Sequence, residues 1–504
     1  MGETKRYQRE SGVVMPIFSL PSPYGIGTLG KEAYNFVDWL VKAGQRYWQI
    51  LPLGHTGFGD SPYQTFSVVA GNPYFVDLDM LIEDGLLTAE DLSNCDMSFE
   101  FVDYEKLAQT RFAVLRKAFE RAKGNCILQE KIKKFTEENQ DWIKDYALFM
   151  SLKSHFSQKP MWDWDDTDIK KRTPKSLETY SLLLKEEIDF YCFIQYFFFK
   201  QWKQLKHYAN ENGILFIGDI PMYPSPDSAD VWANRNLFKV GEDLVCEKVA
   251  GVPPDMYSET GQLWGNPIYD WEVHKKEGYR WWIERIKHML DVTDVIRIDH
   301  FRAFQDYWEI SGNEDTALNG EWVPGPRMEI FETIRKALGD VPIIAEDLGI
   351  ITDEVRELLA ESGYPGMNVI IFGINGTDDS THLPHNYCMN SVAYTSTHDS
   401  ETFTFAVQNA NDTDKNFILE YINYSDNESL GMAAIRTIWS SVSRIAMTMV
   451  SDILSLGEEG RINIPSTLGG NWCWRVLPGQ LTDEHARNLA HLTWLYRRNH
   501  QKED

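Results

Sequence analysis

The sequence predicts an α/β fold in which eight parallel strands close into a (β/α)8 TIM barrel. Two observations support this prediction: short, continuously apolar, β-rich runs recur along the chain, and stretches with helical spacing separate them. An open doubly wound sheet is the competing topology, and the count of eight runs favours the closed barrel. The predicted strands are residues 13–18, 47–53, 214–219, 294–299, 342–346, 368–372, 391–395 and 461–465.

Three of the separating stretches place apolar residues at the spacing of an amphipathic helix. They are residues 31–44, 331–339 and 352–363, and each ends at a glycine. Glycine often terminates a helix because it lacks a Cβ and adopts the left-handed conformation freely. We therefore expect these stretches to be helices that cover the sheet.

Two longer segments do not fit ordinary barrel loops. The first contains charged helical stretches such as residues 103–124, and we predict that it is a helical subdomain inserted after the second strand. The second is rich in Gly, Pro and Trp, which suits an ordered loop folded over a site. The predicted organisation is residues 1–76 for the first barrel strands and helices, 77–210 for the mainly helical insertion, and 211–504 for the remaining barrel with the active-site loop insertion at about 227–290.

The charge of the chain argues against two classes of partner. It carries 49 basic and 75 acidic side chains, a formal net charge of −26. Binding of nucleic-acid phosphates or of anionic lipid requires a surplus of Lys and Arg, so we expect no nucleic-acid partner and no membrane docking. The chain also has 26 Phe, 23 Tyr and 17 Trp, whose flat apolar faces suit sugar rings, although a large core also uses many aromatic residues.

Targeting signals are not evident, and the cysteine pattern fits a reducing compartment. The residues before Gly12 lack an apolar segment, so we expect no signal peptide. The most apolar run, residues 190–199, is too short to span a bilayer and is expected to be a buried helix. Six scattered cysteines without a CxxC spacing indicate free thiols, and we expect a cytoplasmic location.

Carboxylates follow three of the predicted strands, at the end where a parallel barrel places its active site. Asp299 ends the fourth strand, and Arg297 lies on the same face of that strand two residues earlier. Glu346 ends the fifth strand, and Asp399 follows the seventh. An Arg beside a carboxylate favours its ionised form, which a nucleophile requires. The pattern indicates one rim with three carboxylates.

Paired carboxylates in unlike environments are typical of glycosidic chemistry, in which one attacks and the other delivers a proton. The same set would also suit Mg²⁺, but Arg297 would compete for Asp299 and no phosphate-binding glycine loop is present, so we expect no metal. A weak dinucleotide-binding match at residues 25–30 lacks the acidic residue expected after the next strand, where Gly54 and His55 stand.

Longer motifs carry a family resemblance. They are residues 60–79, 218–232, 250–271, 295–304 (VIRIDHFRAF), 345–349 (AEDLG), 394–402 (YTSTHDSET) and 461–475. With these motifs the chain resembles the amylomaltase family, the 4-α-glucanotransferases of the α-amylase superfamily, over nearly its whole length. The resemblance implies a β/α barrel with helical insertions and without a C-terminal β-sandwich domain. Ala303, Ser396, Ser400 and Ser466 depart from residues common in the family, which bears on chain-length preference rather than on the reaction.

The resemblance also implies roles for individual residues. It implies Asp299 as the nucleophile, Glu346 as the acid/base and Asp399 as a third carboxylate that holds sugar hydroxyls and stabilises the transition state. The implied substrate-binding residues are Tyr63, Asp219, Asp255, Gln262, Trp264, Asn266, Arg297, His398 and Asn463.

The implied reaction is a retaining double displacement that moves α-1,4-glucan segments to the 4-hydroxyl of an acceptor glucan or glucose. It requires carboxyl groups about 5–5.5 Å apart and no cofactor. The implied partners are α-1,4-glucans and maltooligosaccharides, bound by a monomer or homodimer. Two alternatives stay open at this point: an α-1,4-glucan hydrolase with the same carboxylates and a wetter cleft, and a catalytically silent glucan-binding protein.

Overall fold

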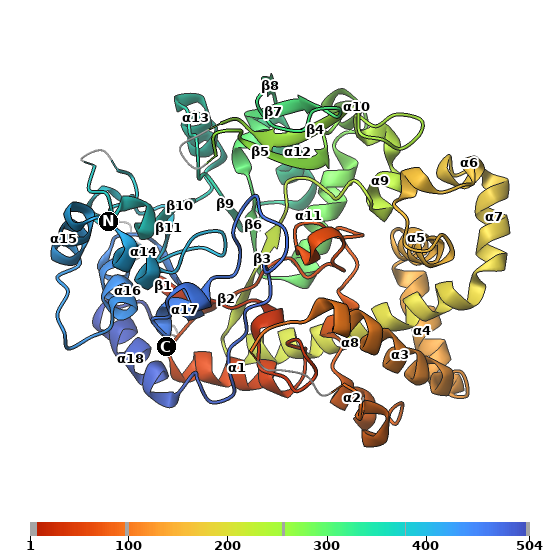
Figure 1. Ribbon diagram of the computed structural model, residues 1–504, viewed down its shortest axis with the longest axis horizontal. Helices are drawn as coiled ribbons and strands as arrows, with labels where there is room; N and C mark the ends of the chain where they lie inside the picture. Colours follow the sequence, from red (N-terminus) through yellow and green to blue (C-terminus); the bar gives the residue numbers. More distant parts are fainter. Residues whose placement is uncertain (1–7, 96–99, 255–257, 378–379, 500–504) are drawn as a thin grey trace, which may run out of the picture.

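Eight parallel strands form a barrel at the centre of the protein (Figure 1). The computed structural model describes residues 8–95, 100–254, 258–377 and 380–499. Hydrogen-bonded neighbours follow the order β10-β11-β12-β1-β2-β3-β6-β9, and every pair is parallel. The predicted (β/α)8 class is therefore confirmed. The strands are β1 (Glu10–Val14), β2 (Tyr47–Gln49), β3 (Leu215–Ile220), β6 (Val295–Ile298), β9 (Ile343–Ala345), β10 (Gly366–Val369), β11 (Ser391–Tyr394) and β12 (Ile445–Met449).

The barrel closes between β9 and β10, a pair of described strands that share no ladder. At this seam the backbone N–H of Ala345 donates to the carbonyl of Pro365 at 2.9 Å. The backbone N–H of Met367 donates instead to the side chain of Asp347, at 2.6 Å from Oδ1. One backbone–backbone hydrogen bond and one hydrogen bond to a side chain thus close the barrel between β9 and β10.

The prediction of the eighth strand is wrong. Residues 461–465 form an irregular loop, and the eighth strand is β12. The loop is held by its own contacts: the N–H of Trp472 donates to the carbonyl of Ile462, and the N–H of Ile464 to the side chain of Asn471. The sequence of β12 contains small and polar residues and runs directly into a helix, which hides its strand character. The first strand lies at Glu10–Val14, earlier than the predicted 13–18, and it ends before residue 18 because Pro16 precedes a 3₁₀ turn at Ile17–Ser19.

A ring of helices covers the outside of the barrel. The three predicted amphipathic helices are present as α1, α12 and α13, and α13 ends at Gly363 in the left-handed conformation, with φ 74°. Around the ring, α18 packs on α1, α1 on α8, α8 on α11, α11 on α12 and α12 on α13. The covering helices are α1 (Lys31–Lys42), α8 (Lys185–Glu211), α11 (Arg280–Val292), α12 (Met328–Leu338), α13 (Asp353–Ser362), α16 (Leu430–Ser440) and α18 (Asp483–Leu495). Helices α14 (Phe403–Asn409) and α17 (Val450–Ile453) pack on α16, and α15 (Asp412–Tyr421) packs on α14.

Several helices lie between β2 and β3 and extend to one side of the barrel (orange to yellow in Figure 1). Residues 190–199 lie in the long helix α8, where most of their side chains are buried, as the sequence predicts. Among the described residues, every helix is too short or too polar to cross a membrane. The helices that precede α8 are α2 (Leu78–Glu83), α3 (Tyr104–Ala122), α4 (Cys126–Glu138), α5 (Ile143–His155), α6 (Thr167–Lys170) and α7 (Pro174–Leu183).

The segment at 227–290 differs from the predicted loop, because it contains regular elements. Two of its strands join two strands that follow β6, in a four-stranded antiparallel sheet ordered β5-β4-β7-β8 (green, at the top of Figure 1). The sequence did not reveal this sheet because its strands are short and interrupted by Gly and Pro. The segment also contains barrel helix α11. The new elements are α9 (Ala229–Ala233), β4 (Lys248–Val252), β5 (Gln262–Pro267), α10 (Trp271–Lys276), β7 (Asp306–Ser311) and β8 (Gly320–Pro324).

A buried ion pair ties the helices between β2 and β3 to the loop after β3. The ammonium group of Lys153, in α5, is 2.5 Å from Oδ2 of Asp227 and also donates to the carbonyls of Gln158 and Lys159. The Lys153 side chain is only 3% exposed. Removing one partner of a buried pair leaves the other charge without compensation.

Replacing Lys153 with Ala is therefore expected to lower the free energy of unfolding by about 3–5 kcal/mol. Urea denaturation of the purified variant measures this change. The double variant Lys153→Met, Asp227→Asn is expected to lose less, because no unpaired charge remains. Lys133→Ala, which removes a lysine that is 67% exposed, is the control. An equal cost for the Lys153 and Lys133 variants would contradict the prediction.

Candidate active site

The predicted site residues gather at the carboxyl ends of neighbouring barrel strands. Asp219 lies in β3 and Arg297 in β6, while Asp299 follows β6 directly. Glu346 follows β9 directly, and Asp399 lies in the turn after β11. This is the end of the barrel at which TIM-barrel enzymes carry out their chemistry.

Arg297 bridges two of the carboxylates. Its Nη1 donates to both oxygens of Asp219, at 2.7 and 2.6 Å, and its Nη2 is 3.0 Å from Oδ1 of Asp299. The guanidinium group is buried, and the Asp219 side chain is fully buried. The planar fork of an arginine suits this geometry, because it presents separate N–H groups to two acceptors.

A second group of side chains continues this network. The amide of Asn463 donates to Oδ1 of Asp399 at 2.7 Å, and Nε2 of His398 is 3.1 Å from Oδ2 of Asp399. The Tyr63 hydroxyl is 2.8 Å from Nε2 of His398 and donates to Oδ2 of Asp219 at 2.7 Å. Tyr63 also stacks on His398, with ring centroids 5.3 Å apart. The contacts thus run without a break from Asn463 to Asp219, which Arg297 joins to Asp299.

Backbone amides hold Glu346. The N–H of His300 donates to its Oε2 at 2.6 Å, and the N–H of Leu348 donates to its Oε1 at 2.7 Å. His300 has φ 51° and ψ 49°, a left-handed conformation that a non-glycine residue rarely adopts. This turn directs the backbone N–H of His300 toward the carboxylate of Glu346. The segment after β6 therefore holds the carboxylate that follows β9.

Burial and neighbouring carboxylates raise the pKa of both central carboxyls. Burial raises the pKa of Asp299 to about 7; Arg297 opposes this change, and Glu346, Asp219 and Asp399 add to it. Burial also raises the pKa of Glu346, against Arg297 and the two backbone amides. The expectation that Arg297 keeps Asp299 ionised accounts for only one of these effects. The pKa values of Asp299 and Glu346 are therefore both raised, and burial is the largest cause for each.

Asp399 has the opposite electrostatic environment. Burial opposes its ionisation, but the charge of His398 and hydrogen bonds from His398 and Asn463 lower the pKa of Asp399 to about 2. Burial acts against the charge on His398 as well, yet Asp399 raises the pKa of that imidazole overall. The rim therefore combines one carboxyl whose pKa is lowered with two whose pKa values are raised.

These opposite shifts give an expected pH dependence of stability. The folded-state pKa of Asp299, about 7, exceeds its ordinary value of 3.8, so its ionisation costs stability as the pH rises from about 4 to above 7. Asp399 has a depressed pKa, and its contribution to stability is present above about pH 4 and is lost as the pH falls through 2. At pH 8, Asp299→Asn is expected to raise the melting temperature by a few degrees and Asp399→Asn to lower it. Calorimetry at pH 5 and pH 8 measures both; a lower melting temperature for Asp299→Asn at pH 8 would contradict this assignment.

Strand β5 places three further predicted residues. Trp264 packs edge-on against His300, with ring centroids 4.8 Å apart, and its Nε1 donates to Gln262 at 3.1 Å. Asn266 is buried; it donates to the carbonyl of Pro224 and accepts from Gln64, both at 2.8 Å. Trp264 thus lies beside the turn that follows Asp299, whereas Asn266 joins β5 to neighbouring loops. Asp255 lies outside the described residues.

Sequence reasoning missed several contributors. Trp472 is buried against Tyr63 and His398, with ring centroids 5.7 and 6.0 Å away. It lies within the motif at 461–475, so its aromatic character was a usable signal. His300 and Leu348 act through backbone amides, a contact that residue type does not reveal.

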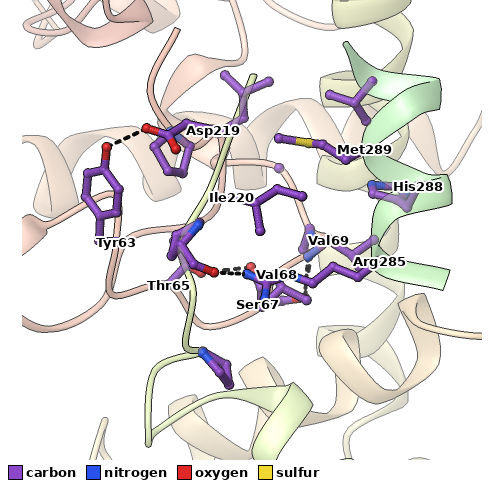
Figure 2. A pocket seen from close by; sticks show the side chains of 18 of the residues that line it. Tyr63, Thr65, Ser67, Val68, Val69, Asp219, Ile220, Arg285, His288 and Met289 are labelled. Carbon is purple, nitrogen blue, oxygen red and sulfur yellow. Dashed lines mark hydrogen bonds between the residues drawn. The ribbon is translucent and has the colours of Figure 1, made fainter. Parts of the chain in front are cut away.

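An apolar cavity of about 50 Å³ lies behind the site. Figure 2 shows it between the loop that carries Tyr63 and Val69, the end of β3 at Asp219, and helix α11 with Arg285 and His288. Tyr63 points toward Asp219, and a dashed line marks their hydrogen bond.

A barrel rim that combines one carboxylate with a lowered pKa and two carboxyls with raised pKa values, on adjacent strands, fits a glycoside-processing enzyme. A family model described as 4-alpha-glucanotransferase matches residues 15–481. The chain therefore belongs to the 4-alpha-glucanotransferases, glycoside hydrolase family 77. The family predicted from the motifs is confirmed.

Individual relatives support the same assignment. The 4-alpha-glucanotransferase of Streptococcus pneumoniae is 47% identical over 494 residues, covering 97% of this chain and 98% of that one. The 4-alpha-glucanotransferase of Clostridium butyricum is 47% identical over 489 residues, covering 96% and 100%. The amylomaltase from Streptococcus agalactiae in complex with acarbose is similar in structure, with a TM-score of 0.96 and 43% identity, covering 98% of this chain and 100% of that one. The chain is an enzyme that transfers α-glucan segments, and the alternative of a hydrolase has less support.

Proposed function

We propose that Asp299 is the nucleophile and Glu346 the acid/base of a retaining double displacement on α-1,4-glucans. Asp299 attacks the anomeric carbon while Glu346 gives its proton to the leaving sugar, so that the glycosidic bond breaks and a glycosyl ester of Asp299 forms. Glu346 then takes the proton of an incoming 4-hydroxyl, and the new glycosidic bond replaces the ester. The observation that carries this proposal is the position of the two carboxyls, which directly follow the adjacent parallel strands β6 and β9 at the same end of the barrel.

In this proposal, some of the neighbouring side chains contact the substrate and others hold those side chains in place. Asp399 is ionised and its side chain is 47% exposed, so it is free to accept hydrogen bonds from sugar hydroxyls. Asp219 is fully buried and both its oxygens are engaged, so we assign it the role of holding Arg297 and Tyr63. The residues that we propose to contact the substrate are Tyr63, Arg297, His398, Asn463, Gln262, Trp264 and Asn266, together with Asp255 from the family resemblance.

Transfer requires that the glycosyl ester survive until a sugar acceptor arrives. The sheet that contains β5 packs beside the turn after Asp299, through the contact of Trp264 with His300. We propose that this sheet excludes water from the ester and that Trp264 stacks on a sugar ring. Because the pKa of Glu346 is raised, its carboxyl group is able to hold the proton that the first step needs. After that proton has been released, the carboxylate acts as the base in the second step.

Incubation with pure maltotriose tests the proposed function. Transfer produces glucose together with maltooligosaccharides longer than maltotriose, which chromatography resolves. Accumulation of shorter sugars only would identify a hydrolase, and an unchanged substrate would indicate a silent glucan-binding protein.

We further propose that the enzyme acts on maltooligosaccharides in the cytoplasm, as a monomer or homodimer and without a cofactor. The six cysteines are unpaired in the structure, which suits a reducing compartment. Sedimentation of the purified protein determines its oligomeric state, and dialysis against EDTA is expected to leave its transferase activity unchanged.

A further inference from the structure

The seam of the barrel depends on the side chain of Asp347. Its Oδ1 accepts the backbone N–H of Met367, the second residue of β10, at 2.6 Å. In the other parallel pairs of the barrel, neighbouring strands exchange backbone hydrogen bonds along a ladder, which β9 and β10 lack. Asp347 therefore supplies an acceptor that a strand carbonyl supplies elsewhere.

The backbone of β10 is shaped to receive this carboxylate. A Cβ added at Gly366 would lie 2.6 Å from Oδ2 and 2.9 Å from Cγ of Asp347, too close for any other residue without a shift. Burial raises the pKa of Asp347 to about 7, although the Met367 amide and Arg356 oppose the change. The contact is thus a fitted, partly buried one rather than a chance surface hydrogen bond.

Asp347 directly follows Glu346, and the two residues share one tight turn. The backbone of Glu346 is bonded to the β6 side, where its N–H donates to Ile298 and its carbonyl accepts from Phe301, each at 3.0 Å. Leu348, on the other side of Asp347, donates its backbone N–H to the Glu346 carboxylate. On the β10 side, the turn itself is held by the Asp347 side chain.

We propose that Asp347 is a positioning residue, which closes the seam between β9 and β10 and thereby fixes the carboxyl of Glu346 over the glycosidic oxygen. The inference rests on the proposed role of Glu346 as acid/base. Without this anchor the turn at 346–348 shifts, whereas Asp299 keeps its own support from β6 and Arg297. Proton transfer is then impaired more than nucleophilic attack.

Two donors with different leaving groups separate these effects. Release of a sugar from maltotriose needs a proton, while α-maltosyl fluoride releases fluoride with little protonation. Asp347→Ala is expected to lower kcat with maltotriose by roughly 10²–10³-fold, the range of general acid catalysis, with a smaller change in KM. The first-turnover burst of fluoride is expected to stay within about threefold of the unmodified enzyme, and azide, an acceptor that needs no base, is expected to restore turnover.

Asp347→Asn retains an oxygen that accepts the Met367 amide and is expected to restore activity to within about tenfold of the unmodified enzyme. Asp452→Ala is the control, because Asp452 is likewise a carboxylate just after a barrel strand that accepts hydrogen bonds from neighbouring segments, although it is more deeply buried than Asp347. It accepts the N–H of Phe403 at 2.8 Å and hydroxyls of the loop before Asp399, so its loss is expected to affect both donors equally. If Asp347→Ala does not fold, Asp347→Ser is measured in the same way.

Glu346→Gln separates the failure of this inference from failure of the proposed function. An equal loss with both donors in Glu346→Gln would overturn its role as acid/base. If Glu346→Gln loses more activity with maltotriose than with α-maltosyl fluoride, but Asp347→Ala loses activity equally with both donors or not at all, the positioning role alone would be overturned. A loss in Asp347→Asn as large as in Asp347→Ala would overturn it as well. Donor dependence in both, with rescue by Asn, supports the proposal.

Discussion

Asp299→Asn is expected to lower kcat for maltotriose disproportionation by about 10⁴-fold or more, the scale seen when a member of a covalent catalytic unit is removed. The amide has nearly the shape of the carboxylate but cannot form the glycosyl ester. Arg297 keeps its two bonds to Asp219, so the supporting network stays in place. Chromatography of the products over time measures the loss.

Substrate binding is expected to survive this substitution. Calorimetric titration with a maltooligosaccharide should give a dissociation constant within about tenfold of the unmodified protein, since Asp299 contributes charge for attack rather than most of the contact area. Mass spectrometry should detect a glycosyl adduct after rapid mixing of the unmodified enzyme with α-maltosyl fluoride, and none with Asp299→Asn. Unchanged sugar turnover in the variant would end the assignment of Asp299.

The barrel was predictable because its strands are continuous apolar runs that differ from the helices around them. Where that contrast fails, the prediction fails. β12 contains Ala446 and Thr448 and leads straight into α17, whereas residues 461–465 have apolar residues but form a loop. The antiparallel sheet at 248–324 is a third example, because each of its strands is short and its pairing depends on contacts distant in sequence.

The part of the site that consists of side chains at strand ends was predictable from the sequence. Asp299, Glu346 and Asp399 lie at one rim because strand ends meet there. Their electrostatics were not predictable, since the pKa of Asp299 depends on burial and on carboxylates from three other strands. The same holds for the amide of His300, which acts on Glu346 through backbone geometry, and for Asp347, whose partner is a backbone group of β10.

The network also separates two electrostatic functions. Asp399 is stabilised as an anion by His398 and Asn463, while burial raises the pKa of both Asp299 and Glu346. Arg297 is the charged group that acts on both regions, because it lowers the pKa of Asp299, Glu346 and Asp399 alike. Its removal should therefore change the titration of the whole rim rather than of one residue.

Arg297→Met is accordingly expected to lower kcat/KM at pH 7 by roughly 10³-fold and to move both limbs of the pH profile to higher pH. The nucleophile must be ionised and the acid protonated; without the guanidinium the pKa of Asp299 rises further above 7, and that of Glu346 rises with it. Arg297→Lys keeps the charge but not the fork that reaches both Asp219 and Asp299, so a smaller loss and a smaller shift are expected. Arg302→Met is the control, because Arg302 is also buried and paired, with Asp306, but contacts no carboxylate of the site; it should lower stability and leave the pH profile in place. If Arg297→Met lost activity equally at every pH, Arg297 would act on the position of the carboxylates and not on their charge.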